Sequence, residues 1–469
     1  MTALSALALI AAAFAVLALL VAIGRAIGPA LGLQRLGLPA AVLAGLLGLL
    51  LGPYGPWPLM PAPIEALWAR LPTVLLTLVF GTLLLGRPLP AIGQLWRPAA
   101  AQTLLGLTLG FGQYLVGALA VLLVLGPWLG ANPLMACLIE VGFEGGHGSA
   151  AVLGPIYADL GFSEGSDLGL AMATVGLLSS TVLGGALVVL AQRRGWLMVH
   201  LPEPVAAAQP VAGDPGTGDG VAEGALAHQP SCPLPEPLSD QPPAGLHTWL
   251  VNLGLVGLAV GVGVLLLATL EWAAEPLQGT WRTVIDALPV YPLALAGSLL
   301  VRLALERSGR TALVQASQQE RIGGIATDLL ITAAMAGLDL PQLARSWLPL
   351  SVLTLAGLGW NLLVLLVLAR RILPIDWFER AVIEFGQATG VAASGLLLLG
   401  MADPDNRSGA LPAFSVKQLL LQPVLAGGVV TVAAPLAVHT WGLPIWTEVC
   451  FGFTALWITL ALLLAHTGS

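Results

Sequence analysis

The chain has 469 residues, of which 57% are apolar and only 9% are charged, whereas a soluble globular domain carries roughly 25% charged residues. This composition indicates a polytopic membrane protein and excludes a soluble enzyme, a nucleic-acid-binding protein and a secreted disulfide-stabilised domain. The net charge of −7 identifies no partner, and three scattered cysteines (Cys137, Cys232 and Cys450) predict neither a disulfide framework nor a metal cluster.

Eleven apolar segments are predicted to cross the membrane as helices. The first, residues 3–23, has no preceding positive residue and no cleavage site, so we expect a retained helix rather than a signal peptide. The others cover 37–52, 71–86, 99–126, 168–192, 249–270, 284–304, 323–338, 346–369, 413–437 and 443–465. Two further segments, 132–155 and 378–401, have the length of a span but contain glycines and carboxylates. We interpret them as re-entrant hairpins.

The 18 basic residues set the predicted orientation. With both hairpins counted as not crossing, 15 of them, including Lys417, fall on one side and three on the other. The positive-inside rule then places the N-terminus outside and residues 195–247 in the cytoplasm. That segment has ten prolines and six acids but no Lys or Arg, which predicts a disordered linker between two membrane halves. We expect the protein in the plasma (inner) membrane.

The same order of elements occurs on both sides of the linker: four spans, a glycine-broken segment and one span. The sequence LIEVG at 138–142 begins the first broken segment, and VIEFG at 382–386 begins the second. An odd number of crossings in each half predicts opposite orientations, as in inverted-repeat transporters whose interrupted segments meet at the binding site. The predicted fold is therefore an all-α membrane protein. It comprises a first repeat (1–194), an inverted second repeat (248–440) and an appended helix (441–469).

The two broken segments contain the candidate binding residues. Glycine lets the backbone leave helical geometry and expose N–H and C=O groups; carbonyls suit Na⁺, and a helix N-terminus suits a carboxylate. The predicted substrate-binding residues are Gly145, Gly146, His147, Gly148, Ser149, Gln387, Ala388, Thr389 and Gly390. Such glycines also serve close helix packing, and His147 taken alone is more simply a hydrogen-bonded packing residue.

Several carboxylates lie within apolar segments, where an unpaired charge costs on the order of 3 kcal/mol. The candidates for cation coupling are Glu140, Glu144, Glu384 and Asp328. If the hairpins are shallow, the glutamates reach water instead, and Asp328 is solvated if it lies at the cytoplasmic end of its span. Gln113 and Asn361 interrupt the fourth span of each half and are expected to form interhelical hydrogen bonds.

Short motifs in both halves resemble those of the sodium/glutamate symporters. The first half has GGHGSAA at 145–151, preceded by NPLM at 132–135 and followed by LGF at 160–162 and AMATVGL at 171–177. In the second half, FGQATG at 385–390 resembles the family's Phe-Gly and Gly-Ala-Thr-Pro-Thr, without the proline. The resemblance implies Na⁺-coupled uptake of L-glutamate, two inverted five-helix repeats with re-entrant loops, and a dimer that works by an elevator-like movement.

The predicted function is a Na⁺-coupled symporter that imports L-glutamate, or a related small carboxylate or amino acid, by alternating access. The loop glycines would present backbone groups, Ser149 and Thr389 would supply hydroxyls, and His147 would orient the substrate. Beyond the transported Na⁺ we expect no cofactor or metal, and as partners only the bilayer and a second copy of the chain in a homodimer. The three glutamates replace small or hydroxyl residues of the family, so either some are protonated or cation-bound, or the cargo differs.

Two other functions remain open at this point. One is an H⁺-coupled transporter of a different small solute, with Glu140, Glu144 or Glu384 as the proton carrier. The more remote is a membrane-embedded hydrolase with Glu144 or His147 as general base and Ser149 as nucleophile. A single active site does not account for a second broken segment in the opposite orientation, and nothing predicts the ring of pore-lining charge that a channel needs.

Overall fold

The computed structural model describes residues 3–30, 40–86, 92–197, 245–275, 282, 285, 288–373, 376–404, 407–422 and 424–466. These residues form helices and turns and contain no strand. Seven helices among them are long and apolar enough to cross a membrane, so the prediction of an all-helical membrane protein is confirmed. The predicted linker 195–247, with Cys232, lies almost entirely outside the described residues.

The first three predicted spans of each half pack together as one group of helices, here called the first group. It contains α1 (Ala3–Ile27), α2 (Ala40–Leu51), α3 (Ala62–Trp68), α4 (Leu71–Thr82), α11 (Leu246–Ala273), α13 (Val290–Arg307) and α14 (Ala316–Ala336). A short 3-10 turn, Thr311–Leu313, precedes α14. Gly48 of α2 lies against Ala336 of α14, and Gly263 of α11 lies against the backbone of Ala294 on α13. Small residues at these crossings let the helices approach closely.

A second group of helices contains the other long helices and the short helices next to them. It contains α5 (Ile92–Ala120), α6 (Gly126–Leu129), α10 (Gly165–Arg194), α16 (Trp347–Leu363), α17 (Ala369–Ile372), α20 (Ala410–Leu421), α21 (Val429–Trp441) and α22 (Leu443–His466). The appended helix α22 packs along α5, where Phe111 contacts the rings of Phe453 and Trp457. Helices α5 and α16 each continue into a π-helical turn, Val121–Leu125 and Val364–Leu368, and both turns have the sequence VLLVL.

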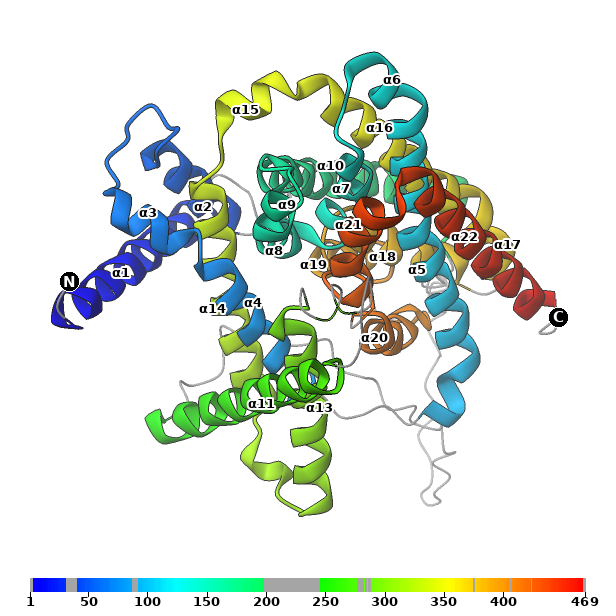
Figure 1. Ribbon diagram of the computed structural model, residues 1–469. Coiled ribbons are helices and arrows are strands. Elements are labelled where there is room, and N and C mark those ends of the chain that lie inside the picture. The colour runs from blue at the N-terminus through cyan, green and yellow to red at the C-terminus, as the bar shows by residue number, and fades with distance from the viewer. Residues whose placement is uncertain are drawn as a thin grey trace, which may run out of the picture.

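The two broken segments lie in the middle of the molecule, between the first group and α5, α16 and α22 (Figure 1). The first consists of the 3-10 turn Pro133–Cys137, α7 (Leu138–Gly142), α8 (Gly146–Val152) and α9 (Gly154–Asp159). The second consists of α18 (Trp377–Thr389) and α19 (Ala392–Ala402), which pack side by side as a hairpin. The short helix α15 (Leu340–Arg345) joins the first group to α16.

One predicted span is not continuous. The segment 413–437 was expected to be a single helix, but α20 ends at Leu421 and α21 begins at Val429. Between them Ala426 has φ 55° and Gly427 has φ 93°, a left-handed conformation that ends a helix. The prediction was wrong because it followed the apolar content of the run and passed over Pro423 and the Gly427–Gly428 pair, which interrupt a helix.

Candidate functional site

The tips of the two broken segments face each other. Gly146, with φ 67°, begins α8, and a Cβ atom built on it would lie 3.4 Å from Cγ1 of Val391 and 3.9 Å from the carbonyl oxygen of Gly390. Gly390 and Val391 form the break between α18 and α19. The structure therefore brings the predicted substrate-binding stretches 145–149 and 387–390 to one place, although 240 or so residues separate them in sequence.

Helices of both halves hold the tip of the second broken segment. The side-chain amides of Gln113 on α5 and Asn361 on α16 both donate to the carbonyl oxygen of Ala388. Asn361 also bonds to the hydroxyl of Thr389 at 3.0 Å, and Gln113 donates to Asn361 at 3.1 Å. The predicted interhelical hydrogen bonds are confirmed, and they fix two of the predicted substrate-binding residues in position.

Glu140 connects the first broken segment to the turn between α20 and α21. Its carboxylate is fully buried and accepts three hydrogen bonds: from the hydroxyl of Tyr114, from Thr431 at 2.9 Å and from the backbone N–H of Ala426 at 3.2 Å. Three donors around one carboxylate compensate for the loss of water. Through these hydrogen bonds Glu140 links α7 to α21 and to the turn before it.

His147 and Ser149 are bonded separately. Nε2 of His147 lies 3.1 Å from the hydroxyl of Thr174, and that hydroxyl donates to the carbonyl oxygen of Leu170. If the Thr174 hydroxyl donates to Leu170, its oxygen accepts from Nε2 of His147, so the tautomer of His147 sets the direction of this bond. Ser149 donates to the carbonyl oxygen of Gly145 at 2.9 Å. Neither bond activates Ser149 as a nucleophile.

A buried charge cluster lies behind the tips. The ammonium of Lys417 on α20 is 2.8 Å from Glu384 on α18 and 3.9 Å from Glu144 at the break between α7 and α8. The other oxygen of Glu384 accepts a bond from Gln102 at 2.9 Å, and Gln102 in turn accepts one from Arg380 at 3.0 Å. The cluster joins both broken segments through α20.

Lys417 also reaches a predicted substrate-binding residue. Its ammonium donates to the side chain of Gln418 at 3.2 Å, and Gln418 donates to Gln387 at 3.1 Å. The basic-residue count had assigned Lys417 to one side of the membrane, but its side chain is 0% exposed, so it is a buried residue that gives no support to the predicted orientation. The missed signal was a single lysine inside an apolar run, since ionisable residues within membrane segments mark functional sites.

Glu144 has the least satisfied carboxylate of the cluster. It is 4% exposed, and its Oε2 atom has no hydrogen-bond partner among the described residues. Its Oε1 atom has the ammonium of Lys417 at 3.9 Å, beyond hydrogen-bonding distance. A buried carboxylate in these surroundings is poorly compensated as an anion.

Asp328 lies away from this site. It forms an ion pair of 2.6 Å with Arg25, which joins α14 to α1 within the first group, and the two side chains are 21% and 56% exposed. No hydrogen bond or ion pair in the described part of the chain links it to the three glutamates. The structure thus separates Asp328 from the other predicted cation-coupling residues.

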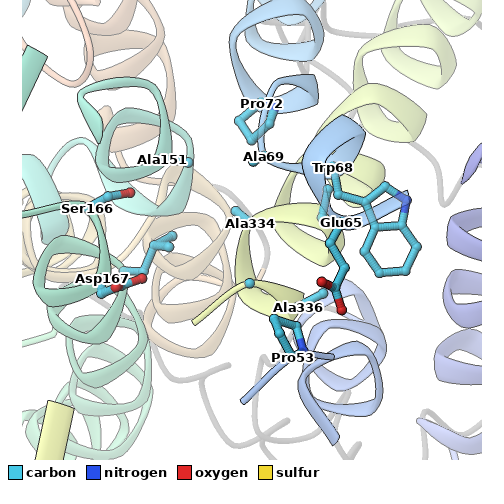
Figure 2. A pocket seen from close by; sticks show the side chains of 13 residues that line it. Pro53, Glu65, Trp68, Ala69, Pro72, Ala151, Ser166, Asp167, Ala334 and Ala336 are labelled. Atoms are coloured by element: carbon cyan, nitrogen blue, oxygen red, sulfur yellow. The ribbon is translucent and has the colours of Figure 1, made fainter. Parts of the chain in front are cut away.

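A cavity of about 190 Å³ lies between the two groups of helices. Figure 2 shows Glu65 and Trp68 of α3 on one side and Ser166 and Asp167 of α10 on the other. Ala151 of α8 also lines it, so the cavity runs to the helix that starts at the first tip.

Comparisons with family models, curated proteins and solved structures found no significant match. The resemblance to sodium/glutamate symporters therefore rests on the short motifs of the two broken segments. What the chain does must be argued from the geometry of these segments and of the charge cluster behind them.

Proposed function

We propose that the protein is a secondary active transporter that moves a small amino acid or monocarboxylate across the membrane by alternating access, coupled to a cation. The observation that carries this proposal is the approach of Gly146 to Gly390 and Val391. Two broken segments from different halves meet tip to tip, the arrangement that forms the binding site of inverted-repeat transporters. The backbone groups of the glycines at the two tips and the hydroxyls of Ser149 and Thr389 are the proposed ligands.

Internal symmetry between the two halves supports the inverted repeat. The fourth span of each half ends in a π-helical turn with the same sequence, VLLVL. In each half a broken segment follows that span, and each is held by elements of the other half: Ala388 by Gln113 of α5, and Glu140 by Thr431 of α21. Such reciprocal contacts are expected of two copies of one unit that face each other.

The division into two groups of helices supports an elevator-like movement. Both broken segments pack on helices of the second group, and α8 meets the first group through Gly148, which lies against Leu76 of α4 and Leu330 of α14. These contacts of Gly148 are apolar, so sliding of α8 past α4 and α14 breaks no hydrogen bond at this point. The cavity between the groups, next to Ala151, is the proposed access route.

The charges around the tips favour a monocarboxylate or zwitterion over a dianion such as L-glutamate. Arg380 is bonded to Gln102 and to the carbonyl oxygen of Pro98, and Lys417 is paired with Glu384. A second carboxylate on the substrate would lie near Glu144 and Glu384. Both cations described at the site, Arg380 and Lys417, already have partners, so neither would neutralise it. L-Glutamate, Na⁺ coupling and the homodimer stay predictions of the motif resemblance.

A hydrolase has less support, because Ser149 donates to Gly145 and not to a general base. Transport is tested with the purified full-length protein in liposomes and a panel of radiolabelled amino acids and monocarboxylates. We expect accumulation of at least one compound above its outside concentration when a Na⁺ or H⁺ gradient is imposed, and none after ionophores remove the gradients. Uptake that ignores every gradient, or no uptake of any panel member, would contradict the proposal.

A further inference from the structure

Two glutamates of the first broken segment differ in how their carboxyl groups are hydrogen-bonded, although they are close in sequence. Glu140 accepts three hydrogen bonds, from Tyr114, Thr431 and Ala426. Glu144 has one oxygen without a partner in the described structure and the other 3.9 Å from an ammonium. When two carboxyls of one site differ in this way, the hydrogen-bonded one is compensated as an anion and the other is suited to exchange a proton.

The charged groups that face Glu144 come from three elements. Lys417 of α20 is the nearest, Glu384 of α18 shares that lysine, and Glu140 lies on the preceding helix α7. Arg380, one turn before Glu384, is bonded to Gln102. Lys417 and Glu384 neutralise each other at 2.8 Å. This leaves Glu144 without a counter-ion of its own and, unlike Glu140, with an oxygen that has no hydrogen-bond partner in the described structure.

We propose that the coupling ion is a proton carried by the carboxyl of Glu144, and that the ammonium of Lys417 occupies the place where a coupling metal cation would otherwise sit. This inference rests on the proposed transport function and names its ion. A hard cation such as Na⁺ needs several oxygen ligands around it. Next to Glu144 and Glu384 the position is taken by a tethered positive charge, which repels a second cation.

The same geometry links the proton to movement. With Glu144 protonated, Lys417 is free to pair with Glu384, as observed at 2.8 Å. When Glu144 releases its proton to water, two carboxylates on two different broken segments compete for one ammonium. Lys417 then moves toward Glu144, and its contact with the second segment weakens. The step is balanced: one O–H bond of Glu144 breaks as the proton leaves on one side of the membrane, and one forms when a proton enters from the other.

The proton site is tested without any substrate, by infrared difference spectroscopy of the full-length protein in lipid nanodiscs during a pH titration. We expect a C=O stretching band of a protonated carboxyl that disappears as the pH rises. The band should be missing in Glu144→Gln and present in Glu140→Gln, the matched control in the same segment. Addition of Na⁺ at constant pH should leave the band unchanged.

Two results would overturn the inference: a band that survives in Glu144→Gln, or one that Na⁺ removes. If Glu144→Gln does not fold, as judged by size-exclusion chromatography, Glu144→Asp gives the same information, because it should shift the titration midpoint of the band while Glu140→Asp should not. Lys417→Gln should shift that midpoint as well, and Lys417→Arg should preserve it more closely. An unchanged midpoint in Lys417→Gln would contradict the role of the lysine.

The outcome is separable from that of the proposed function. The infrared band reports the carboxyl of Glu144 whether or not a transported compound has been found. Na⁺-driven uptake together with a band that Glu144→Gln leaves intact would overturn proton coupling and keep the transporter. The expected band without uptake of any panel member would overturn transport and keep the proton site.

Discussion

Gln113 and Asn361, on helices α5 and α16 from different halves of the chain, bond to each other at 3.1 Å and donate to one shared acceptor, the carbonyl oxygen of Ala388. Both side chains are 0% exposed. Water therefore does not replace either donor, and the tip of the second broken segment is positioned by two amides rather than by its own helix.

Replacement of Asn361 by leucine should loosen this tip. The variant removes one of the two donors to Ala388 and the donor to Thr389, and the loss of a buried hydrogen-bond partner costs about 1–3 kcal/mol. We expect a lower thermal unfolding temperature in detergent and a loss of uptake. Ser351→Ala on the same helix is the control, because Ser351 is exposed and bonds only within α16. Equal effects of the two variants would contradict the role of Asn361.

Gly146→Leu should disturb the approach of the two tips. Any L-residue at its φ of 67° costs about 1–2 kcal/mol, and the side chain would point at Val391 and the carbonyl oxygen of Gly390. Gly130→Leu is the matched control, because Gly130 has φ 61° with nothing within 4 Å of a built Cβ. Both variants should lose similar stability, and only Gly146→Leu should lose transport. Comparable transport in the two would show that the tips do not form the site.

Tyr114→Phe should destabilise the protein through Glu140. The variant removes one of three donors and leaves a buried carboxylate oxygen unsatisfied, at a cost of about 1–3 kcal/mol. Tyr54→Phe, at a residue that is 47% exposed, makes the same chemical change with no expected effect. Thermal unfolding of each variant, alone and combined with Glu140→Gln, gives the coupling energy between the residue at that position and Glu140. Strict additivity of Tyr114→Phe and Glu140→Gln would mean that their hydrogen bond contributes nothing.

Asp328→Asn should change stability by less than about 1 kcal/mol, because exposed ion pairs contribute little. The Arg25–Asp328 pair is partly exposed on both sides, so any effect should shrink as salt screens it. Unfolding temperatures measured at low and high ionic strength check this expectation. A large loss that persists at high salt would return Asp328 to the candidates for ion binding.

Cysteine labelling tests the cavity and the predicted orientation together. In a background without Cys137, Cys232 and Cys450, Ala151→Cys should react with a membrane-impermeant maleimide added to intact cells, because Ala151 lines the cavity. Its neighbour Ala150 is 0% exposed, and Ala150→Cys should not react. Labelling of Ala151→Cys only in inside-out vesicles would reverse the predicted orientation.

The breaks at Gly145 and Gly390 were predictable because glycine and carboxylates interrupt otherwise apolar runs. The break between α20 and α21 has a local signal as well, Pro423 and the Gly427–Gly428 pair, but the left-handed conformation of Ala426, a non-glycine with φ 55°, was not predictable. That conformation is stabilised by contacts with the first broken segment, which include the bond from Ala426 to Glu140. Contacts between residues 286 apart in sequence leave no trace in local composition.

The carboxylates were recognisable from the sequence, but their different roles were not. Glu140, Glu144 and Glu384 look alike in an apolar run, and only the positions of their partners separate an engaged carboxylate from a poorly compensated one. Lys417 was missed as their partner because a count of charges by side assumes that every lysine lies at a surface. Which helix faces which is tertiary information that the periodicity of a single segment does not contain.

The partners of Glu140 also constrain how the protein is made. Two of its three hydrogen bonds come from Ala426 and Thr431, near the end of the chain. During synthesis the first half therefore enters the bilayer with a buried acid that Tyr114 alone can partner, and it stays incomplete until nearly the last helices have been inserted. A truncated product that stops before residue 426 lacks two of the three donors to Glu140 and leaves that buried acid poorly compensated.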